Sequence, residues 1–249
     1  MRQESVQSFT AELWERIVDG LAQGVPPVIG LPGLIGIVVA AVALSIPRRS
    51  WRYFGLFVTV VHELGHVAAS LLTLQRVTGL TLRLDHSGTT TSMGRRDWRS
   101  RVTTFSGYPA PAVVGAALPW SAAHGWAGAA LSVGALVLVA ALLLIRNGQG
   151  VLILGGSAAV ALGLVWFGGE EPACYACVVL GIALLVGACR DWVKVTRVHT
   201  RGRRLDSSDA HLLATSTGVP AAVWLALFAV VISLALVLSL RPLISLVVV

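Results

Sequence analysis

Two histidines and a glutamate stand close together in the stretch FVTVVHELGHVAAS, residues 57–70. On a helix, His62 and His66 lie about one turn apart on the same face. Two imidazoles at that spacing can bind one zinc ion, and Glu63 lies beside them to act on a water bound to the ion. Zinc lowers the pKa of such a water toward neutrality. The spacing therefore predicts a metal site with His62 and His66 as ligands and Glu63 as the general base.

The surroundings of this motif strengthen the prediction. The neighbouring residues are mostly Leu, Phe, Val and Ala, a composition suited to a membrane helix. A charged group at the bilayer centre costs roughly 3 kcal/mol on insertion scales. Three titratable side chains within five residues are therefore hard to retain unless they share a partner, and a metal ion supplies one.

A third zinc ligand is expected in addition to the two histidines, because a catalytic zinc site normally takes three protein ligands and leaves one position for water. Asp191, in CRDW, directly follows an apolar run; its ordinary role would be a helix-end charge. Asp209, in SSDAHLLA, fits the role of a helix N-cap well. Asp191 is therefore the preferred third ligand and Asp209 the alternative. Weaker candidates, expected in loops, are His86, His124, Glu170 and Glu171.

The composition is that of an integral membrane protein. The chain has 249 residues, of which 55% are hydrophobic and 12% charged, about half the charged share of a soluble domain. Runs of about 20 apolar residues can span a bilayer as helices. About seven such segments are expected, at residues 28–47, 53–74, 105–122, 127–145, 150–167, 173–189 and 219–240. The fold class is thus an all-α, multi-pass membrane protein.

The domain organisation follows from these runs. Residues 1–27 are expected to form an amphipathic segment at the membrane interface, and residues 28–249 a single transmembrane domain. The net charge of +7 does not indicate a nucleic-acid partner, because the basic residues lie between apolar runs, where arginines set orientation and contact anionic lipid. These basic clusters are Arg48–Arg52, Arg95–Arg101 and Arg190–Arg204.

The segment VTGLTLRLDHSGTTTSMG, residues 77–94, differs from the other loops. It is rich in threonine and alternates apolar and polar residues around an HSG turn signal, which predicts a β-hairpin directly after the zinc helix. An open strand edge cannot face lipid, so the hairpin must lie in a cavity, in water or against a partner strand. A solvated loop is the alternative.

Several of these motifs together resemble the site-2 protease clan of intramembrane zinc metallopeptidases, in its bacterial and plant branch of short membrane proteins. The resemblance rests on VVHELGHVAASLL, on the hairpin and on SGYPAPAVVGA. It extends to IRNGQGV, CRDW and SSDAHLLATSTGVPAAVW, and covers about residues 55–240.

This resemblance implies zinc bound by His62 and His66, with Glu63 as base. It implies a protease of the bacterial cell membrane that cleaves a single-span membrane protein in or near its transmembrane segment. It also implies that the strand after the zinc helix pairs with an unwound substrate; Thr89, Thr90 and Thr91 would offer hydrogen bonds there.

The chain departs from the better-studied members in two ways. It has no asparagine in the helix after the hairpin and no proline-rich Leu-Asp-Gly segment, which supplies their third ligand. A catalytically inactive scaffold or binding protein is therefore the alternative function. Transport is a further alternative, since buried ionisable groups also mark ion pathways, but no paired repeat is evident. Tyr108 and Asn147 are candidates for stabilising an oxyanion.

Overall fold

The computed structural model describes residues 2–94, 97–201 and 208–247, so Arg95, Arg96, Arg203 and Arg204 of the basic clusters lie outside the described residues. Its elements are α1 (Arg2–Gly20), α2 (Leu31–Ser45), α3 (Arg48–Leu72), β1 (Arg76–Leu82), β2 (Gly88–Met93), α4 (Trp98–Phe105), α5 (Ala110–Ala123), α6 (Ala127–Ala141), a short 3₁₀ turn η1 (Leu142–Leu144), α7 (Gly148–Phe167), α8 (Glu170–Thr200), α9 (Asp209–Thr217) and α10 (Ala221–Val247). The all-α prediction and the predicted hairpin are both confirmed.

The number of membrane spans differs from the prediction. Within the described part of the chain, five helices are long and apolar enough to cross a membrane: α3, α6 with η1, α7, α8 and α10. The other two predicted segments do form helices, α2 and α5, but these have only 15 and 14 residues. A full crossing needs about 20 residues at 1.5 Å per residue, so seven spans are not confirmed. The long apolar helices support an integral, multi-pass membrane protein.

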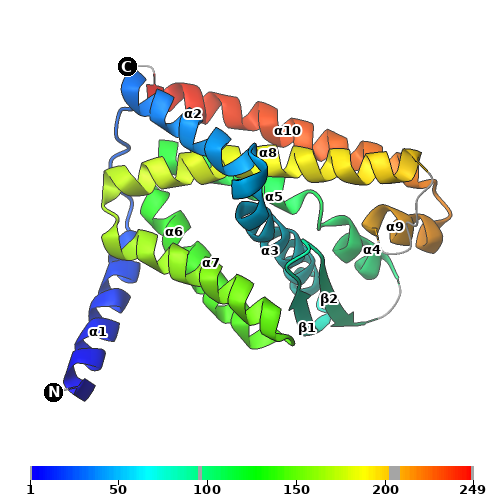
Figure 1. The fold of residues 1–249 in the computed structure, drawn as a ribbon, viewed down its shortest axis with the longest axis horizontal. Coiled ribbons are helices and arrows are strands. Elements are labelled where there is room, and N and C mark those ends of the chain that lie inside the picture. The colour runs from blue at the N-terminus through cyan, green and yellow to red at the C-terminus, as the bar shows by residue number, and fades with distance from the viewer. Residues whose placement is uncertain (1, 95–96, 202–207, 248–249) are drawn as a thin grey trace.

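Helices α5, α8 and α10 pack together extensively, with α10 along the upper edge of the view in Figure 1. Small residues let α5 and α8 approach closely: a Cβ on Gly181 would lie 2.8 Å from the Gly115 carbonyl oxygen and 2.5 Å from Pro119 Cδ. Packing of small residues drives helix association in membranes, where apolar contact alone gives no preference over lipid.

Helix α3 carries the predicted zinc motif toward the hairpin (Figure 1). Pro47 precedes its first turn, where the missing proline N–H costs no helical hydrogen bond. Strands β1 and β2 pair antiparallel and both contact α3. The buried side chains of Leu80 and Leu82 fix the hairpin, because they pack in one apolar cluster with Val60 of α3 and Leu154 of α7.

The amino-terminal segment is a helix, α1, that extends away from the bundle (Figure 1). Phe9 stacks on Trp166 at a centroid distance of 4.6 Å, and Arg16 donates a hydrogen bond to the Trp166 carbonyl. Trp14 is exposed. The interfacial position of this helix stays a prediction.

Candidate metal centre

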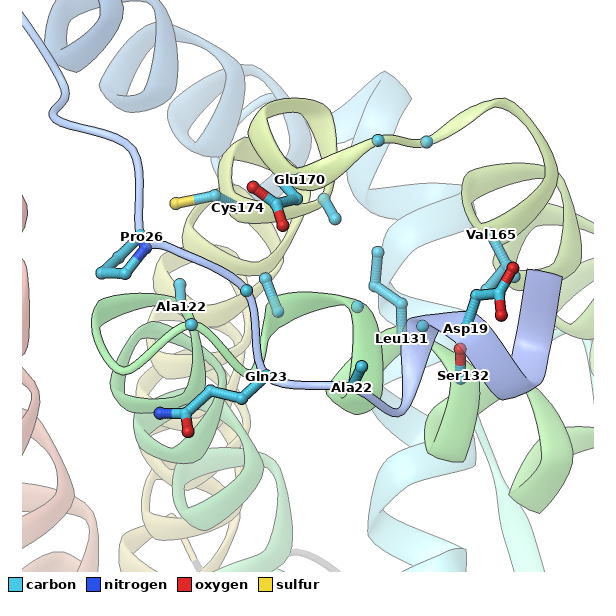
Figure 2. A pocket seen from close by; sticks show the side chains of 18 of the residues that line it. Asp19, Ala22, Gln23, Pro26, Ala122, Leu131, Ser132, Val165, Glu170 and Cys174 are labelled. Atoms are coloured by element: carbon cyan, nitrogen blue, oxygen red, sulfur yellow. The ribbon is translucent and has the colours of Figure 1, made fainter.

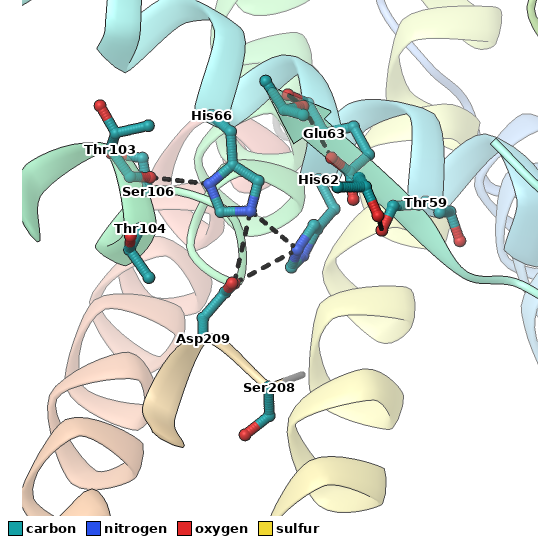
Figure 3. A network of polar contacts seen from close by, with 12 residues as sticks. Thr59, His62, Glu63, His66, Thr103, Thr104, Ser106, Ser208 and Asp209 are labelled. Atoms are coloured by element: carbon teal, nitrogen blue, oxygen red, sulfur yellow. Dashed lines mark hydrogen bonds and ion pairs between the residues drawn. The ribbon is translucent and has the colours of Figure 1, made fainter. Parts of the chain in front are cut away.

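The imidazoles of His62 and His66 face one another on α3, as their spacing predicts (Figure 3). Their Nε2 atoms are 3.2 Å apart. His66 is 8% exposed and Glu63, between them in sequence, is 4% exposed. The ligand atoms of all three residues lie within 4.8 Å of one another. The polar groups of this helix are therefore gathered at one place inside the bundle.

A backbone carbonyl sets the protonation of His66. Its Nδ1 lies 2.7 Å from the Thr103 carbonyl oxygen on α4. A carbonyl only accepts hydrogen bonds, so Nδ1 carries the proton and donates it. The neutral ring then presents a free lone pair on Nε2, the atom that faces His62. Metal-binding histidines are commonly oriented in this way.

Asp209, at the start of α9, is the carboxylate that the structure brings to the histidines. Its Oδ2 lies 3.3 Å from His62 Nε2 and 3.4 Å from His66 Nε2. Burial acts to raise the pKa of this carboxyl, but without an ion between them, positive charge on the two imidazoles holds the pKa below the ordinary value for aspartate. The group is thus an anion directed at the histidine pair (Figure 3).

The sequence favours Asp191 over Asp209 only because an N-cap role accounts for Asp209, and the structure assigns that role to another residue. Ser208 is the N-cap of α9, and its side chain accepts the hydrogen bond from the His211 N–H. Asp209 is consequently the first residue of the helix, and its side chain is free to reach His62. Asp191 lies on α8 and lines the same cavity, but it makes no ion pair with either histidine.

These donor atoms suit a zinc ion. Zinc bonded to imidazole nitrogen and carboxylate oxygen at about 2.0–2.1 Å in a tetrahedron keeps neighbouring ligand atoms about 3.3 Å apart. The three separations among His62, His66 and Asp209 are 3.2, 3.3 and 3.4 Å. Asp209 Oδ2 is also buried, and beyond the two histidine Nε2 atoms it has no hydrogen-bond partner among the described residues. Such a buried charge is unfavourable unless another group compensates it. The residues therefore fit the metal.

Glu63 is held beside this centre by strand β2. The Thr90 hydroxyl donates a hydrogen bond to Glu63 Oε2 at 2.7 Å. The absence of a side chain at Gly88 leaves room for the carboxylate, because a Cβ there would lie 2.5 Å from Glu63 Oε1. The hairpin thus positions the predicted base, a contact that the threonine-rich pattern alone did not reveal.

The centre opens into a cavity of about 790 Å³ between α3, β2, α4, α8 and α9. Thr89 and Thr90 line it, whereas Thr91 does not. Tyr108 also lines it, with its ring edge-on to His62 at a centroid distance of 4.9 Å. The Asn147 side chain is bound to the Leu82 backbone instead, so the structure does not support an oxyanion role for it.

The weaker ligand candidates either lie away from the histidine pair or bond to other groups. His124 donates from Nδ1 to the Trp120 carbonyl at 2.7 Å. Glu170 lines a different cavity of about 310 Å³ near the end of α1, together with Asp19 and Ser132 (Figure 2). His86 lines the site cavity, but its Nε2 lies 3.2 Å from the Arg52 carbonyl.

Gly107, in the SGYPAPAVVGA segment between α4 and α5, lies against the histidine pair. A Cβ on Gly107 would lie 2.5 Å from His66 Nε2 and 2.6 Å from His62 Nε2. We expect Gly107→Ala to weaken zinc affinity by roughly 10- to 100-fold, the range found when supporting groups of a metal site are disturbed. Competition with a fluorescent zinc chelator measures this.

Gly134→Ala is the matched control, since a Cβ on Gly134 of α6 would meet no atom within 4 Å. This variant should bind zinc as the wild type does. Equal affinity in the two variants would show that Gly107 does not border the metal position.

The comparisons with known proteins bear on the whole chain. No curated protein and no solved structure gave a match. The sequence does match the family described as Peptidase M50B-like over residues 34–239. That range contains α3 with its histidines and glutamate, the hairpin, and Asp209. It confirms the resemblance to the site-2 proteases and indicates a protease. The chain belongs to the Peptidase M50B-like family.

Proposed function

We propose that this protein is an intramembrane zinc metalloprotease that hydrolyses a peptide bond in or near the membrane span of a single-span protein. The observation that carries the proposal is the convergence of two imidazoles and one carboxylate at tetrahedral spacing beside a second, hydrogen-bonded carboxylate. All four groups border one cavity inside a bundle of membrane-type helices.

In this proposal, His62, His66 and Asp209 hold the ion, and Glu63 is the general base. Zinc, when bound, polarises the scissile carbonyl and acidifies the attacking water. Glu63 accepts a proton from that water as its oxygen bonds to the carbonyl carbon. Glu63 then gives the proton to the amine that leaves as the C–N bond breaks. Thr90 keeps the carboxylate oriented through its hydrogen bond.

The membrane makes substrate presentation part of the reaction. A transmembrane helix hides its peptide bonds in internal hydrogen bonds, so a few residues must unwind before cleavage. The freed backbone groups need new partners, because unsatisfied groups are costly in lipid. We propose that the hairpin supplies them by pairing with the unwound segment. The bacterial cell membrane as its location stays a prediction.

Metal analysis tests the proposal. We expect the purified protein to contain about one zinc ion per chain, as in a site with one set of three protein ligands. His62→Ala and His66→Ala should lose the ion because each removes one ligand. A strong chelator should remove both the ion and the hydrolysis, and added zinc should restore both.

His124→Ala is the control for the histidine variants, since His124 is bound to the Trp120 carbonyl on α5. It should keep a full zinc content. A wild-type protein without stoichiometric zinc, or histidine variants that retain it, would contradict the proposed metal centre.

A further inference from the structure

Residues 146–149, the end of the loop after η1 and the first two residues of α7, lie along the outer edge of β1. The Arg146 N–H donates to the Leu80 carbonyl at 2.9 Å. The Arg146 guanidinium donates to the Thr78 carbonyl from Nε at 3.1 Å and from Nη2 at 2.9 Å. Leu80 and Ile145 form a parallel bridge. A segment far along the chain therefore occupies the position of a third strand.

Where the chain enters α7, the side-chain amides of Asn147 and Gln149 continue the hydrogen bonding along β1. Asn147 Oδ1 accepts from the Leu82 N–H at 3.2 Å, and its Nδ2 donates to the Leu82 carbonyl at 2.7 Å. Asn147 thus pairs with Leu82 as a peptide group of a neighbouring strand would. Gln149 Oε1 accepts from the Leu84 N–H at 3.2 Å. We call residues 146–149 the edge clamp.

Two glycines make room for the edge clamp. A Cβ on Gly79 would lie 2.8 Å from Arg146 Cγ, and a Cβ on Gly150 would lie 2.6 Å from Asn147 Oδ1. The bulge between Val77 and Gly79 adjusts the register at the same place. The contacts are thus built into both sides of the interface.

The hydrogen bonds to the edge clamp also show in which direction the backbone groups of the hairpin point. Thr78, Leu80, Leu82 and Leu84 use their backbone groups toward the clamp. In an antiparallel pair the direction alternates, so the residues between them bond to β2, as the Arg83 N–H does to Ser87 at 2.9 Å.

The register of the two strands then shows in which direction the backbone N–H and C=O groups of each β2 residue point. Thr91 opposes Gly79 and Thr89 opposes Thr81, so these two threonines face β1. Gly88, Thr90 and Ser92 direct their backbone groups to the opposite edge. All three line the site cavity, and no backbone bond joins them to a residue outside the hairpin in the described part of the chain.

We propose that the edge clamp is a positioning element for proteolysis, an inference that rests on the protease function proposed above. It closes the β1 edge and holds the hairpin so that an extended substrate segment pairs with Gly88, Thr90 and Ser92 alone. On β2, Thr90 donates a hydrogen bond to the Glu63 carboxylate and Gly88 lies against it, whereas β1 contacts α7. A substrate paired with β1 would be bound but not cleaved. Arg146, Asn147 and Gln149 act through β1 and touch no reacting atom.

The test compares Asn147→Leu with wild type in the full-length protein in detergent. Hydrogen–deuterium exchange should show the β1 and β2 amides exchanging roughly tenfold faster or more, because the two hydrogen bonds between Asn147 and Leu82 are lost. Asn147→Asp keeps the acceptor for the Leu82 N–H, so its exchange rates should lie between those of the wild type and those of Asn147→Leu. Gln23→Leu is the matched control, because it removes a hydrogen bond from a side-chain amide to the His124 carbonyl, far from the hairpin. This variant should leave the exchange of the hairpin amides unchanged.

Cleavage is measured with a single-span model substrate whose leucine-rich segment carries a central Asn-Pro pair. Asn147→Leu should keep its zinc content and raise KM by roughly tenfold, with kcat changed by less than about twofold, because binding at the strand edge weakens while the reacting groups stay in place. Unchanged exchange in Asn147→Leu, or a fall in kcat with KM unchanged, would overturn the inference.

The same substrate added to zinc-loaded Glu63→Gln protein maps the edge. New protection at the Gly88, Thr90 and Ser92 amides supports the inference, and new protection at β1 with none at β2 overturns it. Failure of the proposed function has a different signature: wild-type protein that lacks zinc and does not cleave, whatever the exchange of its hairpin.

Discussion

Replacing Glu63 with glutamine is expected to abolish peptide hydrolysis while leaving zinc in place. Glutamine has nearly the same size, so it fits beside Gly88, and its amide can still meet the Thr90 hydroxyl. It cannot accept a proton from water or pass one to the leaving amine. Loss of a general base lowers turnover by roughly 10²- to 10⁴-fold. Single-turnover cleavage of the model substrate, measured alongside zinc content, separates this loss from loss of the metal.

Glu171→Gln is the matched control, because Glu171 is exposed in the first turn of α8. It should cleave at the wild-type rate. Undiminished turnover in Glu63→Gln would mean that another group takes the proton, and the assignment of Glu63 as base would be wrong.

The second large effect is expected at the two aspartates. Asp209→Ala should lose the zinc ion on dialysis and all hydrolysis with it, since it removes the carboxylate that lies 3.3 and 3.4 Å from the histidine Nε2 atoms. Two imidazoles alone make an incomplete site. Asp191→Ala should retain about one zinc ion per chain, because its side chain makes no ion pair with His62 or His66. Zinc content after dialysis against a weak chelator reports both.

The pair is informative because the two carboxylates border the same cavity. A general loss of negative charge there would affect both variants alike, whereas loss of a ligand affects only one. Zinc loss in Asp191→Ala with retention in Asp209→Ala would restore the sequence-based preference. Circular dichroism of each variant checks that the helices remain folded.

Much of the architecture could be predicted from the sequence because its causes are local. Apolar run length is set by bilayer thickness, so helices were expected where α3, α6, α7, α8 and α10 occur. Threonine-rich alternation around a turn signal indicated the hairpin that β1 and β2 form. Run length did not distinguish a full span from the shorter α2 and α5, because neighbouring helices can bury an apolar segment as well as lipid can.

The site divides in the same way. The spacing of His62, Glu63 and His66 on one helix follows from 3.6 residues per turn, so the sequence by itself determined their convergence. The choice between Asp191 and Asp209 depended on whether Ser208 or Asp209 capped α9, and adjacent residues can both fill that role. Only the tertiary structure shows which carboxylate lies near the histidines: α9 packs against α4 and α10, and Asp209 thereby lies 3.3 and 3.4 Å from the histidine Nε2 atoms. The contacts of Asn147 with Leu82 and of Thr90 with Glu63 likewise join segments distant in the chain, and no local pattern encodes which distant backbone a polar side chain will meet.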